Sequence, residues 1–237
     1  TGDVTETIVA PGMTFPVLPH TVDDIKGSLI IDGGAGLLDH SLVSGVTLPW
    51  ETDSALSGPV VPPEVDPVNT ITVYDDSNND DETGALSATT ITGLGMNSGI
   101  TYSNLQVVEV LLGAGDDDFT VSGTASGAIT AVHGGGGNDT LTATGGGGAT
   151  SPLTLFGDTT DDGSRYASDG SAHSSSGNAF TGDGNNTINA SAAGGGVAIY
   201  GGQGDDIITG SQYDDQIAGG AGDDQIDALN GDNHVYG

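Results

Sequence analysis

The sequence predicts an all-β protein whose main body is a solenoid of short, stacked strands. Three observations support this fold class. From about residue 70 onward, short runs of β-branched and apolar residues alternate with turns of Gly, Asp, Asn and Ser. No window shows the apolar period of a capped helix. Near the C-terminus the sequence also repeats itself every nine residues, which is typical of proteins built from stacked coils.

Composition excludes several classes of function. The 237 residues include 33 Asp and Glu but only 2 Lys and Arg, for a formal net charge of −31, and they include no Cys. Nucleic-acid binding requires clustered basic residues, a disulfide scaffold requires Cys, and a membrane-spanning helix requires roughly 18 consecutive apolar residues. We therefore expect no nucleic-acid partner and no membrane insertion. Because no signal peptide precedes Thr1, we expect the chain to be processed or to be part of a longer protein.

The kind of acidic residue points to a binding site. Asp far outnumbers Glu, and it often stands beside Gly. A merely soluble surface would use both acids freely. Short, stiff Asp side chains next to flexible Gly are what oxygen-rich cation sites in tight turns require.

Composition also divides the chain into four parts. Eight of the nine prolines lie at or before Pro67, and proline favours extended connections and strand edges because it lacks a ladder donor. We therefore predict an extended, Pro-containing segment over residues 1–27 and a short β unit with a Pro-rich connection over 28–70. The other parts are an irregular β-solenoid over 71–200 and a regular repeat region over 201–237.

The regular region consists of four consecutive nine-residue units that begin at Gly201. The eighth position of the units is always apolar: Ile208, Ile217, Ile226 and Val235. The sixth position is always Asp or Asn: Asp206, Asp215, Asp224 and Asn233. Similar single units occupy residues 112–120, 134–142 and 181–189. Two features that keep the same phase over four units indicate a structural repeat rather than biased composition.

Each unit can form one turn and one short strand. Gly in the first half tolerates the positive φ angles of a tight turn, and the strand that follows points its middle side chain inward. Two units then make one coil, and stacked coils place parallel strands about 4.8 Å apart. This arrangement predicts Asp206 and Asp224 on one edge of the stack, and Asp215 and Asn233 on the other.

Each edge is then a column of carboxylates that would repel itself without a cation. The donors are all oxygen atoms at flexible spacing, which favours Ca²⁺, because Mg²⁺ requires a stricter octahedron with retained water. We therefore predict several bound calcium ions.

The unit resembles the RTX (repeats-in-toxin, haemolysin-type) calcium-binding nonapeptide, G-G-x-G-x-D-x-U-x. The windows at 134–142, 201–209 and 219–227 match it at every specified position. The resemblance implies a right-handed parallel β-roll, or β-helix, that binds calcium between Gly/Asp-rich turns in secreted or cell-surface bacterial proteins. Residues 71–124 also look like a module that recurs in very large bacterial surface proteins.

The candidate calcium ligands are residues of these units and of their turns. They are Gly113, Gly115, Asp117, Gly134, Gly136, Asp139, Gly182, Asn186, Gly201, Gln203, Asp205, Asp206, Asp214, Asp215, Gly219, Ala221, Asp223, Asp224, Asp232 and Asn233.

Two further acidic runs stand outside the repeats. Asp158 and Asp162 are candidate ligands in a loop that is similar to that of an EF-hand, although its third and closing positions depart from that pattern. A solvated loop is the alternative. The run 75–82 is a second possible metal site, but we predict a hydrophilic hairpin tip, because blocks of like charge are usually solvated.

We expect no enzymatic activity from these residues. The five His are scattered, no Cys is available for zinc, and no G-x-S-x-G nucleophile motif is present. Solenoids that cleave anionic polysaccharides need cationic groups at the substrate, whereas this chain has only Lys26 and Arg165 and a strongly negative field.

The sequence therefore predicts a calcium-dependent extracellular structural or adhesive module, which assembles end to end or continues in a larger surface protein or filament. One alternative is the calcium-binding C-terminal module of a secreted enzyme or toxin. Another is a carbohydrate- or ice-binding adhesin module, with Thr140, Thr142 and Thr144 on a flat face. Tyr side chains such as Tyr200, Tyr213 and Tyr236 could stack on sugars or pack on the solenoid surface.

Overall fold

The computed structural model describes residues 21–34, 68–158 and 184–237, and within these ranges the chain forms strands and turns that build two sheets. Sheet A contains, in spatial order, β1 (Leu29–Asp32), β5 (Ile100–Ser103), β4 (Thr90–Gly93), β3 (Thr83–Leu86), β7 (Asp118–Val121), β9 (Thr140–Ala143), β11 (Thr187–Asn189), β13 (Ile207–Thr209) and β15 (Gln225–Asp227). Sheet B contains β16 (His234–Tyr236), β14 (Gln216–Ala221), β12 (Ala198–Gln203), β10 (Leu153–Phe156), β8 (Ile129–His133), β6 (Val107–Leu111) and β2 (Thr70–Tyr74). No membrane-spanning helix occurs among these residues.

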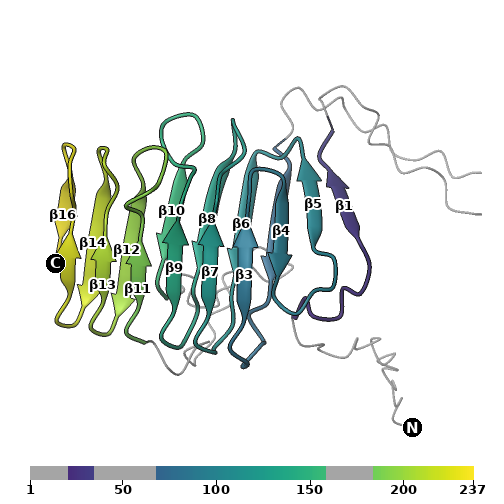
Figure 1. The fold of residues 1–237 in the computed structure, drawn as a ribbon, viewed down its shortest axis with the longest axis horizontal. Helices are drawn as coiled ribbons and strands as arrows, with labels where there is room; N and C mark the ends of the chain where they lie inside the picture. Colours follow the sequence, from purple (N-terminus) through teal and green to yellow (C-terminus); the bar gives the residue numbers. More distant parts are fainter. Residues whose placement is uncertain (1–20, 35–67, 159–183) are drawn as a thin grey trace, which may run out of the picture.

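From β6 onward the chain alternates between the sheets, so that one strand of each makes one coil (Figure 1). Each strand pairs in parallel with the strand one coil later, as Ile208 does with Ile226 and Ile199 with Ile217. The coils stack along the long axis of the molecule, with β1 near one end and β16 at the other (Figure 1). The prediction of an all-β parallel solenoid is therefore confirmed.

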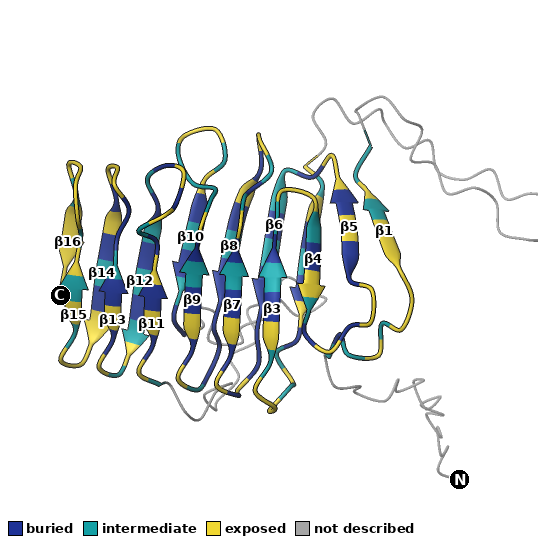
Figure 2. Cartoon of the chain, in the orientation of Figure 1, coloured by how far each residue is buried: buried dark blue, intermediate teal, exposed yellow. Residues whose placement is uncertain are grey.

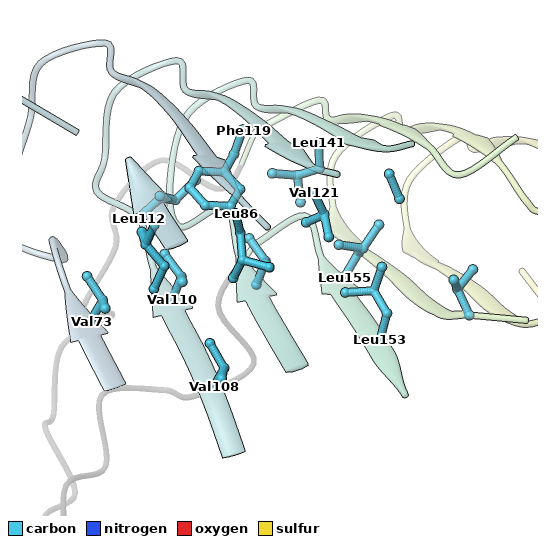
Figure 3. Packing of buried hydrophobic residues seen from close by; sticks show 14 of the residues in the cluster. Val73, Leu86, Val108, Val110, Leu112, Phe119, Val121, Leu141, Leu153 and Leu155 are labelled. Carbon is cyan, nitrogen blue, oxygen red and sulfur yellow. The ribbon is translucent and has the colours of Figure 1, made fainter. Parts of the chain in front are cut away.

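The core lies between the two sheets, because alternate side chains of each strand point inward. In sheet A, Phe119, Leu141, Ile188 and Ile208 are in register and at most 1% exposed. Sheet B contributes a facing column of Val, Leu and Ile, which includes Leu155. Figure 2 shows this buried stripe along successive strands, and Figure 3 shows the side chains meeting between the sheets. Each fully buried side chain of this size contributes roughly 1.5–3 kcal/mol.

The parallel pattern changes at β4, which pairs antiparallel with both β3 and β5. β3 ends at Leu86 and β4 begins at Thr90, and so short a connection can join only antiparallel neighbours, because a parallel crossover needs roughly a dozen residues. Ser87 N–H donates to the Thr90 carbonyl oxygen (2.8 Å) and closes the turn. The simple two-strand coil therefore does not extend over these residues.

The run 75–82 is not a hairpin tip, and that prediction was wrong. β2 belongs to sheet B and β3 to sheet A, so the run is a turn between the sheets. Its first carboxylate, Asp75, is 1% exposed and accepts a hydrogen bond from Val22 N–H (2.9 Å). Burial raises the pKa of Asp75 above its ordinary value.

The predicted division of the chain is only partly within the described residues. β1 lies in the short β unit predicted for 28–70, whereas residues 1–20 and 35–67 are outside the described ranges. β12 crosses from 71–200 into 201–237, so both of these parts contribute to the same two sheets. Near residue 200 the sequence repeat becomes regular, while the two sheets continue through this point. A domain boundary there stays a prediction.

Candidate metal centre

The turns that run from sheet B to sheet A form one edge of the solenoid, called here the first edge. The residue directly before each sheet A strand makes an inner column along this edge, from the β2–β3 turn to the β14–β15 turn. Its members are Glu82, Asp117, Asp139, Asn186, Asp206 and Asp224. Each backbone N–H donates to the side-chain oxygen of the next member, at 2.7–3.0 Å. The inner column is therefore continuous from coil to coil.

A second column lies one residue earlier in each turn and faces solvent. Its members are Asp81, Asp116, Asn138, Asn185, Asp205 and Asp223. Here each backbone N–H donates to the side-chain oxygen of the preceding member, at 2.8–2.9 Å. The two columns therefore link neighbouring coils in opposite directions along the same edge.

The inner column contains buried carboxylate oxygens without a partner. Oδ2 of Asp139 and Oδ2 of Asp206 accept no hydrogen bond, although both residues are only 1% exposed. Burial raises the pKa of Asp139 to about 8 and the pKa values of Asp117 and Asp206 to about 6. Neighbouring carboxylates raise these pKa values further. An unpaired buried charge of this kind requires a proton or a cation.

Glycines place backbone carbonyl oxygens beside these carboxylates: at Gly134 and Gly201, an added Cβ would lie within 2.5 Å of both a carbonyl oxygen and Oδ2 of Asp139 or Asp206. At Gly137, Gly184, Gly204 and Gly222, an added Cβ would lie 1.8–2.3 Å from the carbonyl oxygen of the glycine one coil earlier. Only glycine leaves room for this close stacking of turns. The donor set along the first edge is therefore oxygen only, from carboxylate, amide and carbonyl groups, and it fits Ca²⁺.

We expect Gly204→Ala to impair calcium-induced folding. Gly204 has a φ of +103°, and its added Cβ would stand 2.3 Å from the Gly184 carbonyl oxygen. Strain of this kind costs roughly 1–3 kcal/mol, so the calcium concentration at the folding midpoint should rise about tenfold in a circular dichroism titration. Gly123→Ala is the control, because its Cβ would lie 3.8 Å from the nearest atom, Ala88 N. Equal midpoints for the two variants would contradict the close stacking of carbonyls and glycines.

The opposite edge carries a shorter and better satisfied column. Asp215 accepts from Val197 N–H (2.9 Å), Ser211 N–H (2.6 Å) and Ser211 Oγ (2.7 Å), and its own N–H donates to Asn233 Oδ1 (2.9 Å). On the first edge, by contrast, Asp206 N–H donates to Asp224 Oδ1. The prediction that these two pairs lie on opposite edges is therefore confirmed.

Within the part of the chain that the structure describes, no three His, Asp or Glu side chains converge on one point. A cation between two coils would thus receive about two carboxylates and would take its other ligands from backbone carbonyl oxygens. Calcium binds six to eight oxygen ligands in flexible geometry, and carboxylate and backbone carbonyl oxygens are both ligands that it accepts.

Asp158 lies on the first edge with the repeats. It is 6% exposed, its Oδ1 accepts from Asn186 Nδ2 (3.0 Å), and its Oδ2 accepts from Gln203 N–H (2.7 Å). These contacts place Asp158 beside the inner column. The rest of the predicted EF-hand-like loop lies outside the described residues. The predicted ligands Asp162 and Gly182 lie outside the described residues.

The remaining predicted ligands are distributed over both edges. The first-edge turns carry Gly113, Gly115, Gly134 and Gly136. Gly201 and Gln203 lie at the end of β12, and Gly219 and Ala221 at the end of β14, where these strands lead into the same edge. The opposite edge carries Asp214 and Asp232. Sequence reasoning favoured a hairpin tip for the run 75–82 and therefore did not name Asp81 and Glu82, which extend the two first-edge columns. Their position directly before a β-type run, like that of Asp117, is the signal that could have found them.

Comparison with known proteins agrees with this geometry. A family model described as the RTX calcium-binding nonapeptide repeat matches four copies, in residues 131–148 and 199–237. These ranges cover less than half of the chain. Comparisons with curated proteins and with solved structures each found no significant match. The chain thus contains several calcium-binding repeats, and calcium is their cofactor.

Proposed function

We propose, from the RTX calcium-binding repeats in residues 131–148 and 199–237, that this chain is an extracellular structural or adhesive β-roll module that folds when calcium binds. The observation that carries the proposal is the pair of buried, unpartnered oxygens, Oδ2 of Asp139 and Oδ2 of Asp206, in a continuous acidic column. Near neutral pH, such a column is unstable until cations occupy it.

The calcium ligands in this proposal are neighbouring carboxylates of the inner column. Three neighbouring pairs in the column consist of two acids: Glu82 with Asp117, Asp117 with Asp139, and Asp206 with Asp224. Two charges about 5 Å apart repel each other by roughly 1–3 kcal/mol, depending on their exposure to water. A calcium ion between coils replaces this repulsion with attraction and also binds the adjacent carbonyl oxygens.

The affinity expected of such sites supports an extracellular location. Calcium sites of extracellular modules typically have Kd values of about 10⁻⁴–10⁻³ M, so millimolar calcium outside cells fills them and cytosolic calcium does not. At a calcium concentration about ten times Kd, each site stabilises the fold by about 1.4 kcal/mol. Several sites together decide whether a chain with 42 Gly and a net charge of −31 is folded.

A calcium titration followed by circular dichroism tests the proposal. We expect the metal-free chain to lack most of its β-structure near neutral pH and to gain it cooperatively at about millimolar calcium. Magnesium at the same concentration is the control, and it should have little effect because Mg²⁺ requires stricter geometry. β-structure that persists unchanged in excess chelator would refute calcium-dependent folding.

Assembly is a further part of the proposal. In the described residues β15 and β16 each have a strand partner on one side only, and Val235 and Tyr236 are 46% and 61% exposed. Another coil, from the same chain or from a second copy, would cover these side chains. We expect the calcium-loaded chain to form oligomers or filaments in light scattering and electron microscopy. Monodisperse monomers at high concentration would exclude self-assembly of this chain.

We also propose that the role is not catalytic, because the five His are scattered and the chain has no Cys and no G-x-S-x-G motif.

Aromatic rings pack against one another along sheet B. The ring of His133 stacks on Phe156 at 4.4 Å, and that of Phe156 stacks on Tyr200 at 5.1 Å. Tyr200 Oη accepts from Gln216 Nε2 (2.9 Å). These contacts favour surface packing for Tyr200.

A carbohydrate-binding role remains an alternative to the structural one. Thr120 and Thr142 pair in register on the outer face of sheet A, and the same row continues through Asn189 to Thr209, so that these polar side chains could contact a flat ligand. Binding in a glycan array, abolished when Thr142 is replaced by Val, would favour this alternative.

A further inference from the structure

A groove of about 560 Å³ lies beside the sheet A-to-sheet B turns, where β10, β12, β14 and β16 begin. Leu153 and Val197, which are 1% and 4% exposed, contribute its apolar floor. The groove exists because the turns 144–152 and 190–197 are longer than the turns 210–215 and 228–233, so the edge of the stack has a step. Its volume is in the range of ligand sites.

Two exposed carboxylates line the groove on the side of the shorter turns. Asp232 N–H donates to Asp214 Oδ1 (2.8 Å), which places the two side chains one coil apart. Lys26, a basic residue within the described ranges, contacts Asp23 and Asp24. It precedes β1, a strand that lies near the other end of the stack (Figure 1). The groove therefore combines an apolar floor with paired negative charges that Lys26 does not neutralise.

We infer that this groove binds a lysine or arginine side chain of a different, basic protein. The aliphatic stem would lie on Leu153 and Val197, and the cationic head would lie between Asp214 and Asp232, as long cationic side chains do on apolar surfaces. Charge complementarity selects this occupant, because a net charge of −31 attracts cationic partners and speeds their encounter. A second copy of the chain is a poor occupant of this groove, because it has only two basic side chains, Lys26 and Arg165, to place between the carboxylates.

A calcium ion on Asp214 and Asp232 is the competing occupant. The apolar floor distinguishes the groove from the first edge, where oxygen atoms of glycine backbones surround the carboxylates. The experiment therefore uses the full chain in saturating calcium, so that a pair already neutralised by calcium would show no binding.

Fluorescence polarisation with a labelled oligolysine peptide tests the inference, and an acetyl-lysine peptide of the same length is the probe control. We expect the wild-type chain to bind oligolysine in a salt-dependent manner and to bind the acetylated peptide at least tenfold more weakly. The double variant Asp214→Asn/Asp232→Asn should bind oligolysine about five- to tenfold more weakly, which is the size expected for two partly exposed ion pairs.

Two further variants separate the groove from the general field of the protein. Asp118→Asn/Asp227→Asn removes the same charge from the outer face of sheet A and should change affinity less than twofold. Ala198→Phe fills the groove and removes no charge, and it should weaken binding at least fivefold. Circular dichroism in calcium verifies that each variant is folded.

The outcomes that overturn the inference are distinct. No binding by the wild-type chain in calcium would assign Asp214 and Asp232 to a metal ion or leave the groove empty. Equal losses in the two Asp→Asn double variants would show binding to the overall field rather than to the groove. Unchanged affinity of the folded Ala198→Phe variant would show that the apolar floor takes no part.

Discussion

Acidification should fold the metal-free chain. Burial raises the pKa of Asp139 to about 8 and the pKa values of Asp117 and Asp206 to about 6, above their ordinary value of 3.8. The folded state therefore binds protons more strongly than the unfolded state, and its stability increases as the pH falls. This contribution is complete below about pH 4 and is lost as the pH rises through 6 and then 8.

Circular dichroism of the dialysed, metal-free protein between pH 8 and pH 5 measures this effect. The lower pH limit stays above the isoelectric point of about 4.1, at which the chain has no net charge and would precipitate. We expect β-structure to increase toward pH 5 without added metal. In parallel, calcium affinity at pH 8 should exceed that at pH 6, because each ion displaces protons from the same carboxylates.

The variant Asp139→Asn is the control for the pH effect, because it removes the group with the most strongly raised pKa. Its metal-free folding should depend less on pH between 7 and 8 than that of the wild-type chain. A wild-type chain that loses β-structure on acidification from pH 8 to pH 5 would contradict this account of the inner column.

Asp206→Asn should stabilise the metal-free fold and weaken calcium binding. Asn186 shows that an amide fits this column, because its Oδ1 accepts from Asp139 N–H while its Nδ2 donates to Asp158. The new amide could likewise accept from Asn186 N–H, and it would replace the unpartnered Oδ2 with a donor. Removing a buried, unsatisfied charge should add roughly 1–3 kcal/mol to the metal-free stability.

Circular dichroism in chelator near neutral pH, which reports the folded fraction, and calcium titration by calorimetry measure the two effects of Asp206→Asn. We expect greater stability without metal, together with a loss of about tenfold or more in calcium affinity at the affected site. Asp227→Asn is the matched control, since it makes the same charge change at an exposed position on β15. If Asp206→Asn lowered metal-free stability, the unpartnered oxygen would not be a source of instability.

The regular part of this fold could be predicted because local and repeated signals agree. The apolar eighth positions Ile208, Ile217 and Ile226 lie on strands, and they alternate between the two sheets as the repeat predicts. The nine-residue repeat also predicted that Asp206 and Asp224 lie on the same edge of the solenoid, as they do. A periodic sequence repeats one local geometry, so a correct unit predicts the whole stack.

The irregular parts could not be predicted because their partners are distant in sequence. Asp81 and Glu82 extend the first-edge columns only because the 75–82 turn stacks on the turn that contains Asp116 and Asp117. Asp158 is beside Asn186 for the same reason, across 28 residues of chain. The antiparallel pairing of β4 depends on the short turn between Leu86 and Thr90, and the sequence of this turn marks it only weakly.

The sequence by itself determined the repeat, the alternation of inward side chains and the excess of Asp, and hence a calcium-binding solenoid. Only the tertiary structure decided which carboxylate oxygens are buried without a partner. In the sequence, Asp205 and Asp206 are equivalent neighbours, yet one faces solvent and the other is enclosed between coils. The physical reason is that desolvation depends on the coils stacked above and below, and desolvation is what makes a carboxylate require calcium.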